Sequence, residues 1–321
     1  MNDNKQIITI AIDAMGGDAG PAVTVPAAIT FLKKQGGKIS ASKNTAGSNA
    51  VSSTDQPIQH KIILVGIEEQ IDSLIQQYGG AQMLARGQLE VHAASQVVEM
   101  HEAPALALKK KKDSSMRVAV NLVKDGSAQA CVSAGNTGAL MATASFVLRT
   151  IPGIKRPAII STLPCRDSSK TVHMLDLGAN VDSTPEMLLQ FAIMGSVITR
   201  FVDRKEKPAV GLLNVGAEEI KGSEKVKKAS LLLGESKLNY VGYIEGDQIL
   251  SSKVDVIVCD GFEGNVALKA SEGTASMILG VLKEEFKRNW LTRFLALLCT
   301  PIFSRMRMRL DPRRHNGASL I

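Results

Sequence analysis

Short apolar runs recur along the chain and alternate with longer segments of helical periodicity. Most of these runs are apolar on both faces, which predicts strands covered from both sides; they lie at residues 7–13, 61–66, 129–135, 156–162, 171–178, 209–216, 239–245 and 255–261. Helices are predicted between several of them, at residues 68–77, 115–124, 138–149, 184–203 and 219–233. The alternation predicts a Rossmann-like α/β fold with a mainly parallel sheet, flanking helices and right-handed crossovers.

One segment breaks this alternation. Residues 36–59 are rich in Gly, Ser, Asn and Thr with almost no large apolar side chains, so burial cannot offset the entropy cost of ordering them. We interpret them as a flexible surface insertion. A chain of 321 residues that is 45% apolar can bury one large core, or the cores of two closely joined domains. We expect a single α/β catalytic domain over residues 1–321.

Composition and charge exclude several classes of protein. No apolar run approaches the ~20 residues that span a bilayer, and the N-terminal MNDNKQ lacks the pattern of a signal peptide. The four cysteines show no C-x-x-C spacing, which favours reduced, buried thiols in a cytoplasmic protein. The net charge of +7 is concentrated in residues 283–314, where nine Lys and Arg face three acids. Such a local basic segment predicts one local contact and no nucleic-acid partner.

Five of the predicted strands end in glycine-rich polar turns, at residues 13–20, 133–138, 176–182, 214–219 and 260–265. In open parallel sheets ligands bind outside the carboxyl ends of strands, where glycine lets backbone N–H groups approach and a helix N-terminus favours an anion. The chain has no G-x-G-x-x-G, no P-loop sequence and no metal-binding motif, and Ser133 is only a near match to a nucleophile elbow. Phosphate or a phosphorylated ligand remains, with a purely structural turn as the alternative.

Several long motifs occur together in a known order. They are IAIDAMGGDAGP, KKDSSM, VSAGNTGALM, RPAI, LDLGANVD, PEMLLQFAIMG, GLLNVGAEEIKG and VCDGFEGNVALK. On these motifs the chain resembles the PlsX family, the bacterial acyl-ACP:phosphate acyltransferases, over about residues 7–35 and 60–320. The resemblance implies a fold related to phosphotransacetylases and the isocitrate-dehydrogenase-like group. It also implies the reaction of fatty acyl-ACP with inorganic phosphate to give acyl phosphate and free ACP, which feeds phospholipid synthesis.

The sequence departs from this family in two places. The insertion at 36–59 is longer than the family usually has there, which a surface loop tolerates. The chain also stops at NGASLI, where similar proteins continue for a few tens of residues through a glycine-rich strand and a helix. We therefore expect part of the C-terminal family segment to be missing.

Phosphate is a competent nucleophile near neutral pH, so the simplest mechanism is its direct attack on the thioester without an acyl-enzyme. We expect no cofactor and no metal. The predicted phosphate-binding residues are Ser133, Gly135, Asn136, Thr137 and Gly138. A substrate-site loop is predicted from Asp13, Gly16, Gly17 and Asp18, in which the acids cap helices, orient donors or pair with lysines because phosphate would repel them.

Three residues are candidates for stabilising negative charge on the thioester oxygen: Asn180, Asn265 and Lys269. Each amide has a structural alternative. Asn265 could cap a helix that starts near Val266, and Asn180 could fix its own turn.

A lysine run is the candidate docking site for the acidic carrier protein. It comprises Lys109, Lys110, Lys111 and Lys112, with a solvated charge run as the alternative. The following residues, Asp113–Ser115, predict a helix N-cap.

The basic segment near the C-terminus predicts contact with the inner face of the cytoplasmic membrane. Its apolar run is about half a bilayer span, and arginines follow it; the contact residues are Trp290, Leu291, Phe294, Leu295, Leu298, Arg305 and Arg307. A dimer interface is the alternative, since the resemblance implies a homodimer. It also implies that a membrane-bound glycerol-3-phosphate acyltransferase consumes the product.

Two other functions stay open: a phosphotransacetylase-like enzyme that uses acyl-CoA, and an inert membrane-attached scaffold that binds acyl ligands.

Overall fold

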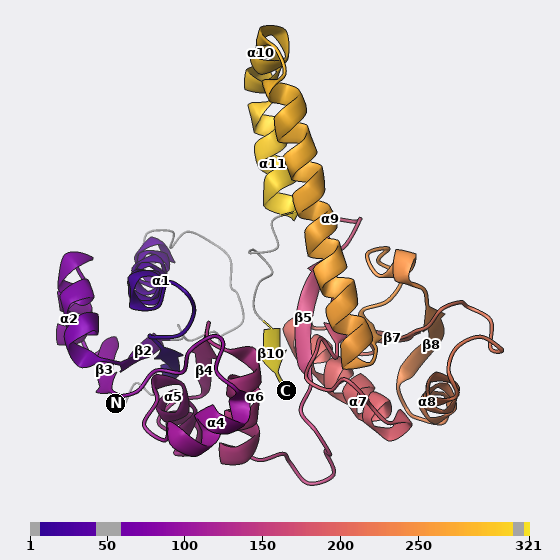
Figure 1. The fold of residues 1–321 in the computed structure, drawn as a ribbon, viewed down its shortest axis with the longest axis horizontal. Helices are drawn as coiled ribbons and strands as arrows, with labels where there is room; N and C mark the ends of the chain where they lie inside the picture. The colour runs from indigo at the N-terminus through magenta and orange to yellow at the C-terminus, as the bar shows by residue number, and fades with distance from the viewer. Residues whose placement is uncertain (1–6, 43–58, 311–317) are drawn as a thin grey trace. The chain divides into compact units, whose positions relative to one another are not determined.

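The computed structural model describes residues 7–42, 59–310 and 318–321. Its contacts divide the chain into two compact units, Met1–Arg149 (unit 1) and Thr150–Ile321 (unit 2), each with its own sheet (Figure 1). The structure thus has two compact units. That they act together as a single catalytic domain stays a prediction.

Unit 1 is built on a four-stranded parallel sheet with the order β3-β2-β1-β4. Its strands are β1 (Ile7–Asp13), β2 (Gln59–Gly66), β3 (Leu89–Ala93) and β4 (Ala130–Ser133). Its helices are α1 (Pro21–Ser42), α2 (Glu68–Gln77), α3 (Ala81–Ala85), α4 (Pro104–Lys110), α5 (Ser115–Lys124) and α6 (Thr137–Val147). The predicted helices at 68–77 and 115–124 match α2 and α5 at both ends.

Strand β2 shows why these strands are apolar on both faces. Ile62 and Leu64 pack into one core cluster with residues of α1 and α2, such as Ile29 and Ile71. The alternate residues of β2, represented by Ile63, pack with α5 in a second cluster on the opposite face. Because side chains alternate across a strand, the continuous apolar run places helices on both faces of the sheet.

The predicted insertion at 36–59 differs from the structure at its start. Helix α1 continues to Ser42, so residues 36–42 are helical. The earlier turns of α1 are anchored in the core by Val25, Ile29 and Leu32, and each further residue adds a backbone hydrogen bond at low cost. The rest of the predicted insertion, residues 43–58, lies outside the described residues, and β2 begins at Gln59.

Unit 2 contains a six-stranded sheet with the order β10-β5-β6-β9-β7-β8. Its strands are β5 (Ile159–Pro164), β6 (Thr171–Leu175), β7 (Ala209–Leu213), β8 (Asn239–Ile244), β9 (Val256–Val258) and β10 (Ala318–Leu320). The pairs from β6 to β8 are parallel, as predicted, whereas β5 pairs antiparallel with both β6 and β10. The short connection between β5 and β6 explains this difference, because parallel neighbours need a long crossover.

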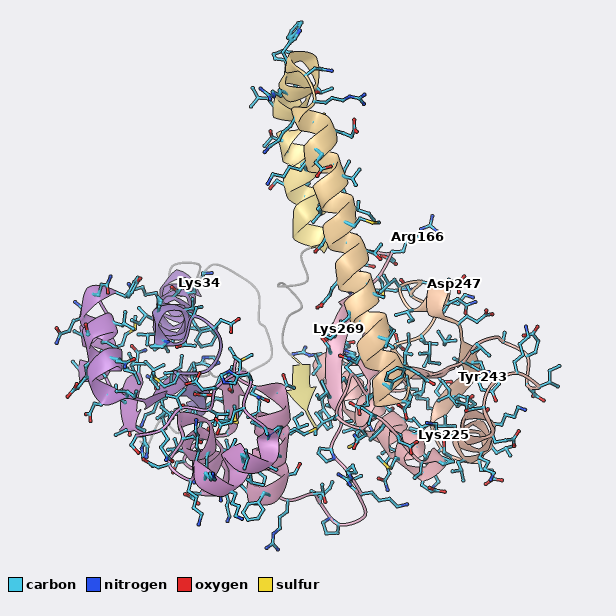
Figure 2. The ribbon with its side chains drawn as sticks, in the orientation of Figure 1. Lys34, Arg166, Lys225, Tyr243, Asp247 and Lys269 are labelled. Carbon is cyan, nitrogen blue, oxygen red and sulfur yellow. The ribbon has the colours of Figure 1, made fainter. Side chains whose placement is uncertain are left out.

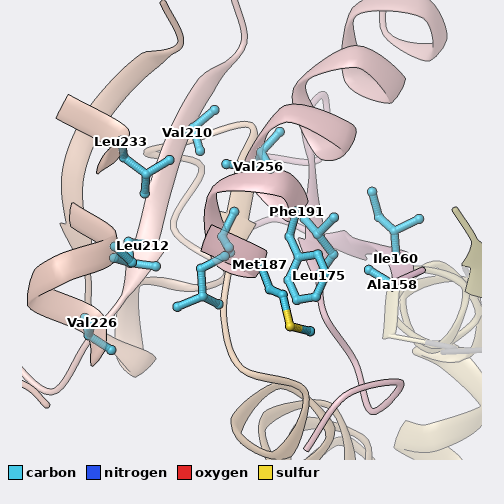
Figure 3. Close-up of a cluster of buried hydrophobic side chains, with 14 residues drawn as sticks. Ala158, Ile160, Leu175, Met187, Phe191, Val210, Leu212, Val226, Leu233 and Val256 are labelled. Carbon is cyan, nitrogen blue, oxygen red and sulfur yellow. The ribbon is translucent and has the colours of Figure 1, made fainter. Parts of the chain in front are cut away.

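The main core of unit 2 lies under helix α7 (Pro185–Val202). Figure 3 shows Met187 and Phe191 of α7 against Leu175 of β6 and Val256 of β9. Helix α8 (Glu224–Gly234) adds Val226 and other apolar residues to the same cluster. This packing fixes the carboxyl ends of β6, β7 and β9 next to the turns that the sequence singles out. The short 3-10 helix η1 (Gly246–Gln248) follows β8.

Three helices follow β9 in sequence: α9 (Gly261–Lys287), α10 (Trp290–Leu298) and α11 (Thr300–Leu310). Figure 1 shows α9 as a long helix with α11 alongside it, and the rings of Phe286 and Phe303 meet edge to face with centroids 4.7 Å apart. The apolar helix α10 ends at Leu298, and Pro301 is the second residue of α11. Among the described residues, no helix combines the length and the apolar character needed to cross a bilayer.

Candidate functional site

In unit 1 the predicted turn begins with a pair of side chains at the carboxyl ends of neighbouring strands. Asp13 ends β1, Ser133 ends β4, and the parallel register places them opposite one another. The Ser133 hydroxyl donates a hydrogen bond to Asp13 Oδ2 at 2.6 Å and accepts one from the backbone N–H of Gly135 at 3.1 Å. Asp13 is 2% exposed, so this hydrogen bond is buried. The pairing of β1 with β4 therefore joins the predicted substrate loop to the predicted phosphate turn.

The glycines of the 13–20 loop allow this loop to lie against the 133–138 turn. A Cβ on Gly16 would lie 2.8 Å from both Asp13 Oδ2 and the Gly135 nitrogen. Gly17 has φ +87°, and a Cβ there would approach the Ala134 carbonyl oxygen at 3.0 Å. The close approach and the left-handed backbone both explain why glycine occupies these positions. The fourth predicted residue of this loop, Asp18, is exposed.

Helix α6 begins directly after the turn, and Asn136 is its N-cap. The Asn136 side chain accepts from the Ala139 N–H at 3.0 Å and donates to the carbonyl oxygens of Met100 and Glu102 at 2.9 Å each. The amides of Thr137 and Gly138 have no protein acceptor among the described residues, as expected for the first turn of a helix. The Asn136 side chain is thus engaged by the protein, whereas these two backbone donors are available to an anion.

In unit 2 the turn after β6 is organised around buried Asp176. Its Oδ1 accepts from the backbone N–H groups of Ile159 and Ala179, and its Oδ2 accepts from the backbone and side-chain nitrogens of Asn180. Asn180 Nδ2 also donates to the Pro157 carbonyl oxygen at 2.8 Å. Both side-chain donors of Asn180 are therefore in use, which favours the alternative that Asn180 fixes its own turn.

Asn265 and Lys269 lie one helical turn apart on α9, so their side chains share one face. The helix begins at Gly261 with Asp260 as its cap, so the prediction that Asn265 caps a helix starting near Val266 is wrong. The helix therefore begins five residues earlier, because Asp260, two residues after the end of β9, caps its first turn. Among the described residues no group bonds the Asn265 side chain, and it packs over Gly178, which has φ +123°. Asn265 therefore retains free amide donors beside the Asp176 turn.

A lysine that sequence reasoning missed joins this region. Lys225 of α8 lies 2.9 Å from Asp260 Oδ2 and 3.6 Å from Asp182 (Figure 2 labels Lys225 and Lys269). Burial alone would raise the pKa of Asp260, but hydrogen bonds from Ser183, Lys225 and Phe262 outweigh burial and hold this pKa below its ordinary value. Burial likewise opposes the charge on Lys225, yet Asp260 raises the Lys225 pKa. The pair fixes the start of α9 and keeps Asp260 ionised.

The cysteines near these turns are unsuited to nucleophilic catalysis. Burial raises the pKa of Cys131, and the charge of Asp13 raises it further. Cys259 is 1% exposed, and burial raises its pKa well above the ordinary value. Both groups therefore stay thiols near neutral pH. Across the described residues, no group of His, Cys, Asp and Glu side chains could hold a metal ion.

The predicted docking run divides in the structure. Lys111 is half-buried, lies 2.6 Å from Glu102 and donates to the Val97 carbonyl oxygen, so it holds the chain before α4 in place. Lys109, Lys110 and Lys112 are exposed. The predicted cap is confirmed, because the Ser114 side chain accepts from the Arg117 N–H at the start of α5.

The arrangement of glycine-rich turns at the carboxyl ends of parallel strands defines an α/β ligand-binding protein. The fold is similar to that of a phosphotransacetylase from Streptococcus pyogenes, with TM-score 0.57, 16% identity and coverage of 84% of this chain and 82% of that chain. It is also similar to a branched-chain phosphotransacylase from Enterococcus faecalis, with TM-score 0.53, 12% identity and coverage of 83% and 84%. These likenesses confirm the predicted fold class.

The family is shown by sequence. Residues 8–321 match the family model described as fatty acid synthesis protein. The chain is 52% identical over 315 residues to a Legionella pneumophila protein named Phosphate acyltransferase, covering 98% of this chain and 84% of that protein. It is also 52% identical over 314 residues to a Chromobacterium violaceum protein of the same name, covering 98% and 83%. The chain belongs to this family, and the predicted acyltransferase family is confirmed.

Proposed function

We propose that this chain transfers a fatty acyl group from the thioester of acyl carrier protein to inorganic phosphate, giving acyl phosphate and free carrier thiol. The observation that carries the proposal is its family membership over nearly the whole chain. The structure supports it with backbone donors suited to phosphate at the start of α6, and with the Asn265 amide and the exposed Lys269 ammonium on one face of α9.

The proposed reaction needs no covalent enzyme intermediate. An oxygen of hydrogen phosphate attacks the thioester carbon, the C–O bond forms and the C–S bond breaks. The phosphate proton passes to the departing sulfur, so the atoms and charges balance. Asn265 and Lys269 stabilise the negative oxygen that develops on the attacked carbonyl. The raised pKa values of Cys131 and Cys259 support direct attack, since neither thiol is ionised.

We expect release of carrier thiol to require phosphate, and to be faster with acyl-ACP than with acyl-CoA of the same chain length. Thiol release and acyl phosphate formation measured side by side with both donors check this result. A preference for acyl-CoA would favour the phosphotransacetylase-like alternative, and no release from either donor would favour the inert scaffold.

The Ser133→Ala variant should retain turnover, and no acyl group attached to the protein should be detectable by mass spectrometry. A stable acyl adduct on the protein would contradict direct attack.

The carrier protein is proposed to dock on a basic surface of unit 1 formed by Lys109, Lys110, Lys112 and neighbouring cations. The Arg117 guanidinium donates to the Leu108 carbonyl oxygen at 3.4 Å, which places it beside the end of α4. Arg117 also lines a cavity of about 600 Å³ with Lys124 and Arg149. An acidic partner is steered by such a surface, and its on-rate should fall as salt increases.

Helix α10 is proposed to rest on the inner face of the cytoplasmic membrane. Its exposed apolar side chains recur at helical spacing, with Trp290 79%, Phe294 55% and Leu298 62% exposed. Arg305 of α11 is also exposed and could meet anionic headgroups. The side chains of the other predicted contacts, Leu291, Leu295 and Arg307, lie outside the described residues.

We expect the protein to co-sediment with anionic vesicles and to be released by salt. Phe294→Glu with Leu298→Glu should abolish sedimentation while leaving acyl transfer in solution within about twofold, because α10 is distant from the α9 residues proposed for catalysis. Leu231→Glu is the matched control, since Leu231 is 70% exposed on α8. Loss of a dimer in the α10 variant, detected by light scattering, would instead assign the helix to a subunit interface.

A homodimer is proposed as the assembly, as the family resemblance implies. The product is a labile amphiphile, so we propose that a membrane-bound glycerol-3-phosphate acyltransferase consumes it. Residence at the membrane surface would shorten the path of the acyl phosphate to that enzyme.

A further inference from the structure

The hydrogen bonds of Ser133 leave it able to accept but unable to donate. A serine hydroxyl has one proton and two acceptor lone pairs. In the structure the proton is committed to Asp13 Oδ2 at 2.6 Å, and one lone pair is taken by the Gly135 N–H at 3.1 Å. One lone pair remains. Any ligand that contacts Ser133 Oγ must therefore bring its own hydrogen.

Asp13 keeps the serine proton in this arrangement. It is 2% exposed, and its second oxygen, Oδ1, is buried without a donor among the described residues. A carboxylate with so few donors holds the one hydrogen bond that it has strongly, because its charge is not shared with water. The serine hydroxyl cannot turn toward a ligand without leaving that carboxylate unpaired, which is costly in a buried site.

The turn also offers donors that attract an anion. The backbone N–H groups of Thr137 and Gly138 open α6, an eleven-residue helix, and no acceptor for them lies in the described part of the chain. Ser133 stands at the other end of the same short turn, four residues before Thr137. The turn thus presents donors on one side and an acceptor backed by a buried carboxylate on the other. Only an anion that still carries a proton satisfies both.

We propose that the Asp13–Ser133 pair selects protonated oxyanions, so that the turn binds hydrogen phosphate and rejects oxyanions of the same charge that have no proton. The inference rests on the proposed function in placing phosphate at this turn. Ser133 accepts a hydrogen bond from the phosphate hydroxyl, and Asp13 is a positioning residue that fixes the polarity of Ser133. Sulfate and monofluorophosphate are dianions of similar size, but they carry no proton. They cannot donate a hydrogen bond to Ser133 Oγ, and their oxygen lone pairs repel the lone pair of the serine.

Binding of the three anions to the protein alone tests this selection. Calorimetry with phosphate, sulfate and monofluorophosphate, at a pH where phosphate is mainly hydrogen phosphate, should show phosphate at least about tenfold tighter than the other two, as expected for one hydrogen bond replaced by repulsion. Equal affinity for the three anions in the wild-type protein would overturn the proposal.

Asp13→Asn reverses the polarity of the pair, because its amide can donate to Ser133 and free the serine proton. We expect its phosphate preference over monofluorophosphate to fall to about threefold or less, with sulfate binding more tightly than in the wild type. Ser133→Ala removes the acceptor and should narrow the preference similarly, whereas Ser133→Thr keeps the hydroxyl and should restore it. If a folded Asp13→Asn or Ser133→Ala variant keeps the full preference, the pair does not select the anion.

The acyl-transfer assay separates this inference from the proposed function. Selective anion binding without phosphate-dependent acyl transfer would support the anion selection and contradict the acyltransferase. Phosphate-dependent acyl transfer would support the acyltransferase. If sulfate and monofluorophosphate inhibit it with inhibition constants equal to the dissociation constant of phosphate, the proposed selection is overturned.

Discussion

Gly264→Ala should unfold unit 2 or lower its stability by about 3 kcal/mol or more. A Cβ at this position would lie 1.9 Å from the Asp176 carbonyl oxygen and 2.8 Å from Cys259 Sγ. The first neighbour is backbone, and it belongs to the turn whose Asp176 side chain already accepts four hydrogen bonds. Neither the Asp176 turn nor the start of α9 can move freely, so the added methyl group forces α9 away from the sheet.

The same helix provides the control for this substitution. Gly273 and Gly280 of α9 have nothing within 4 Å of an added Cβ. Alanine at either position should stabilise the helix by about 0.5–1 kcal/mol, because glycine loses more backbone entropy in a helix. Urea unfolding of the three variants measures the contrast. Equal stability of Gly264→Ala and Gly273→Ala would show that α9 does not approach the Asp176 turn as closely as described.

Asn265→Ala should lower kcat by about a hundredfold to a thousandfold, the usual effect of removing one oxyanion donor. The thermal unfolding temperature should change little, since the Asn265 side chain bonds no group in the described part of the chain. KM for acyl-ACP should also change little if the amide acts only on the charge that develops in the transition state. Steady-state kinetics with acyl-ACP and phosphate, together with thermal unfolding, check both expectations.

Asn265→Asp tests whether the hydrogen-bond donors of the Asn265 amide or only the size of its side chain matter for catalysis. It keeps the size of the side chain but replaces the N–H donors with a negative charge, so it should be at least as inactive as Asn265→Ala. An active Asn265→Asp variant, or a fall in activity matched by a fall in stability, would remove Asn265 from catalysis.

Local periodicity predicted the elements that depend on local sequence. Helices at 68–77 and 115–124 were predicted to the residue because apolar spacing marks both, and the second also begins at a serine cap. Strand β3 was missed, since LEVHA is short and mostly exposed. The antiparallel pairing of β5 and the start of α9 were also missed, because both depend on contacts that one sequence does not display.

The candidate site was predicted as a set of turns, but its contacts were not. The residues of the Asp13–Ser133 pair are 120 positions apart, and they meet only because β1 and β4 are neighbours in the sheet. Lys225 gave no motif, and it reaches Asp260 across 35 positions. Glycine-rich turns after strands indicate where a ligand binds, while strand order decides which side chains meet there.

The length of helix α9 separates the residues proposed for catalysis from the helix proposed to contact the membrane. Its 27 residues correspond to a length of about 40 Å, with Asn265 near one end and the apolar helix α10 following the other. One fatty acyl chain spans about half the apolar thickness of a bilayer, roughly 15 Å. If acyl transfer takes place beside Asn265 and α10 contacts lipid, as we propose, the acyl group cannot reach that lipid while its phosphate stays bound. On that proposal the product leaves its binding site before its chain enters the membrane, so acyl transfer and delivery to the membrane are successive steps.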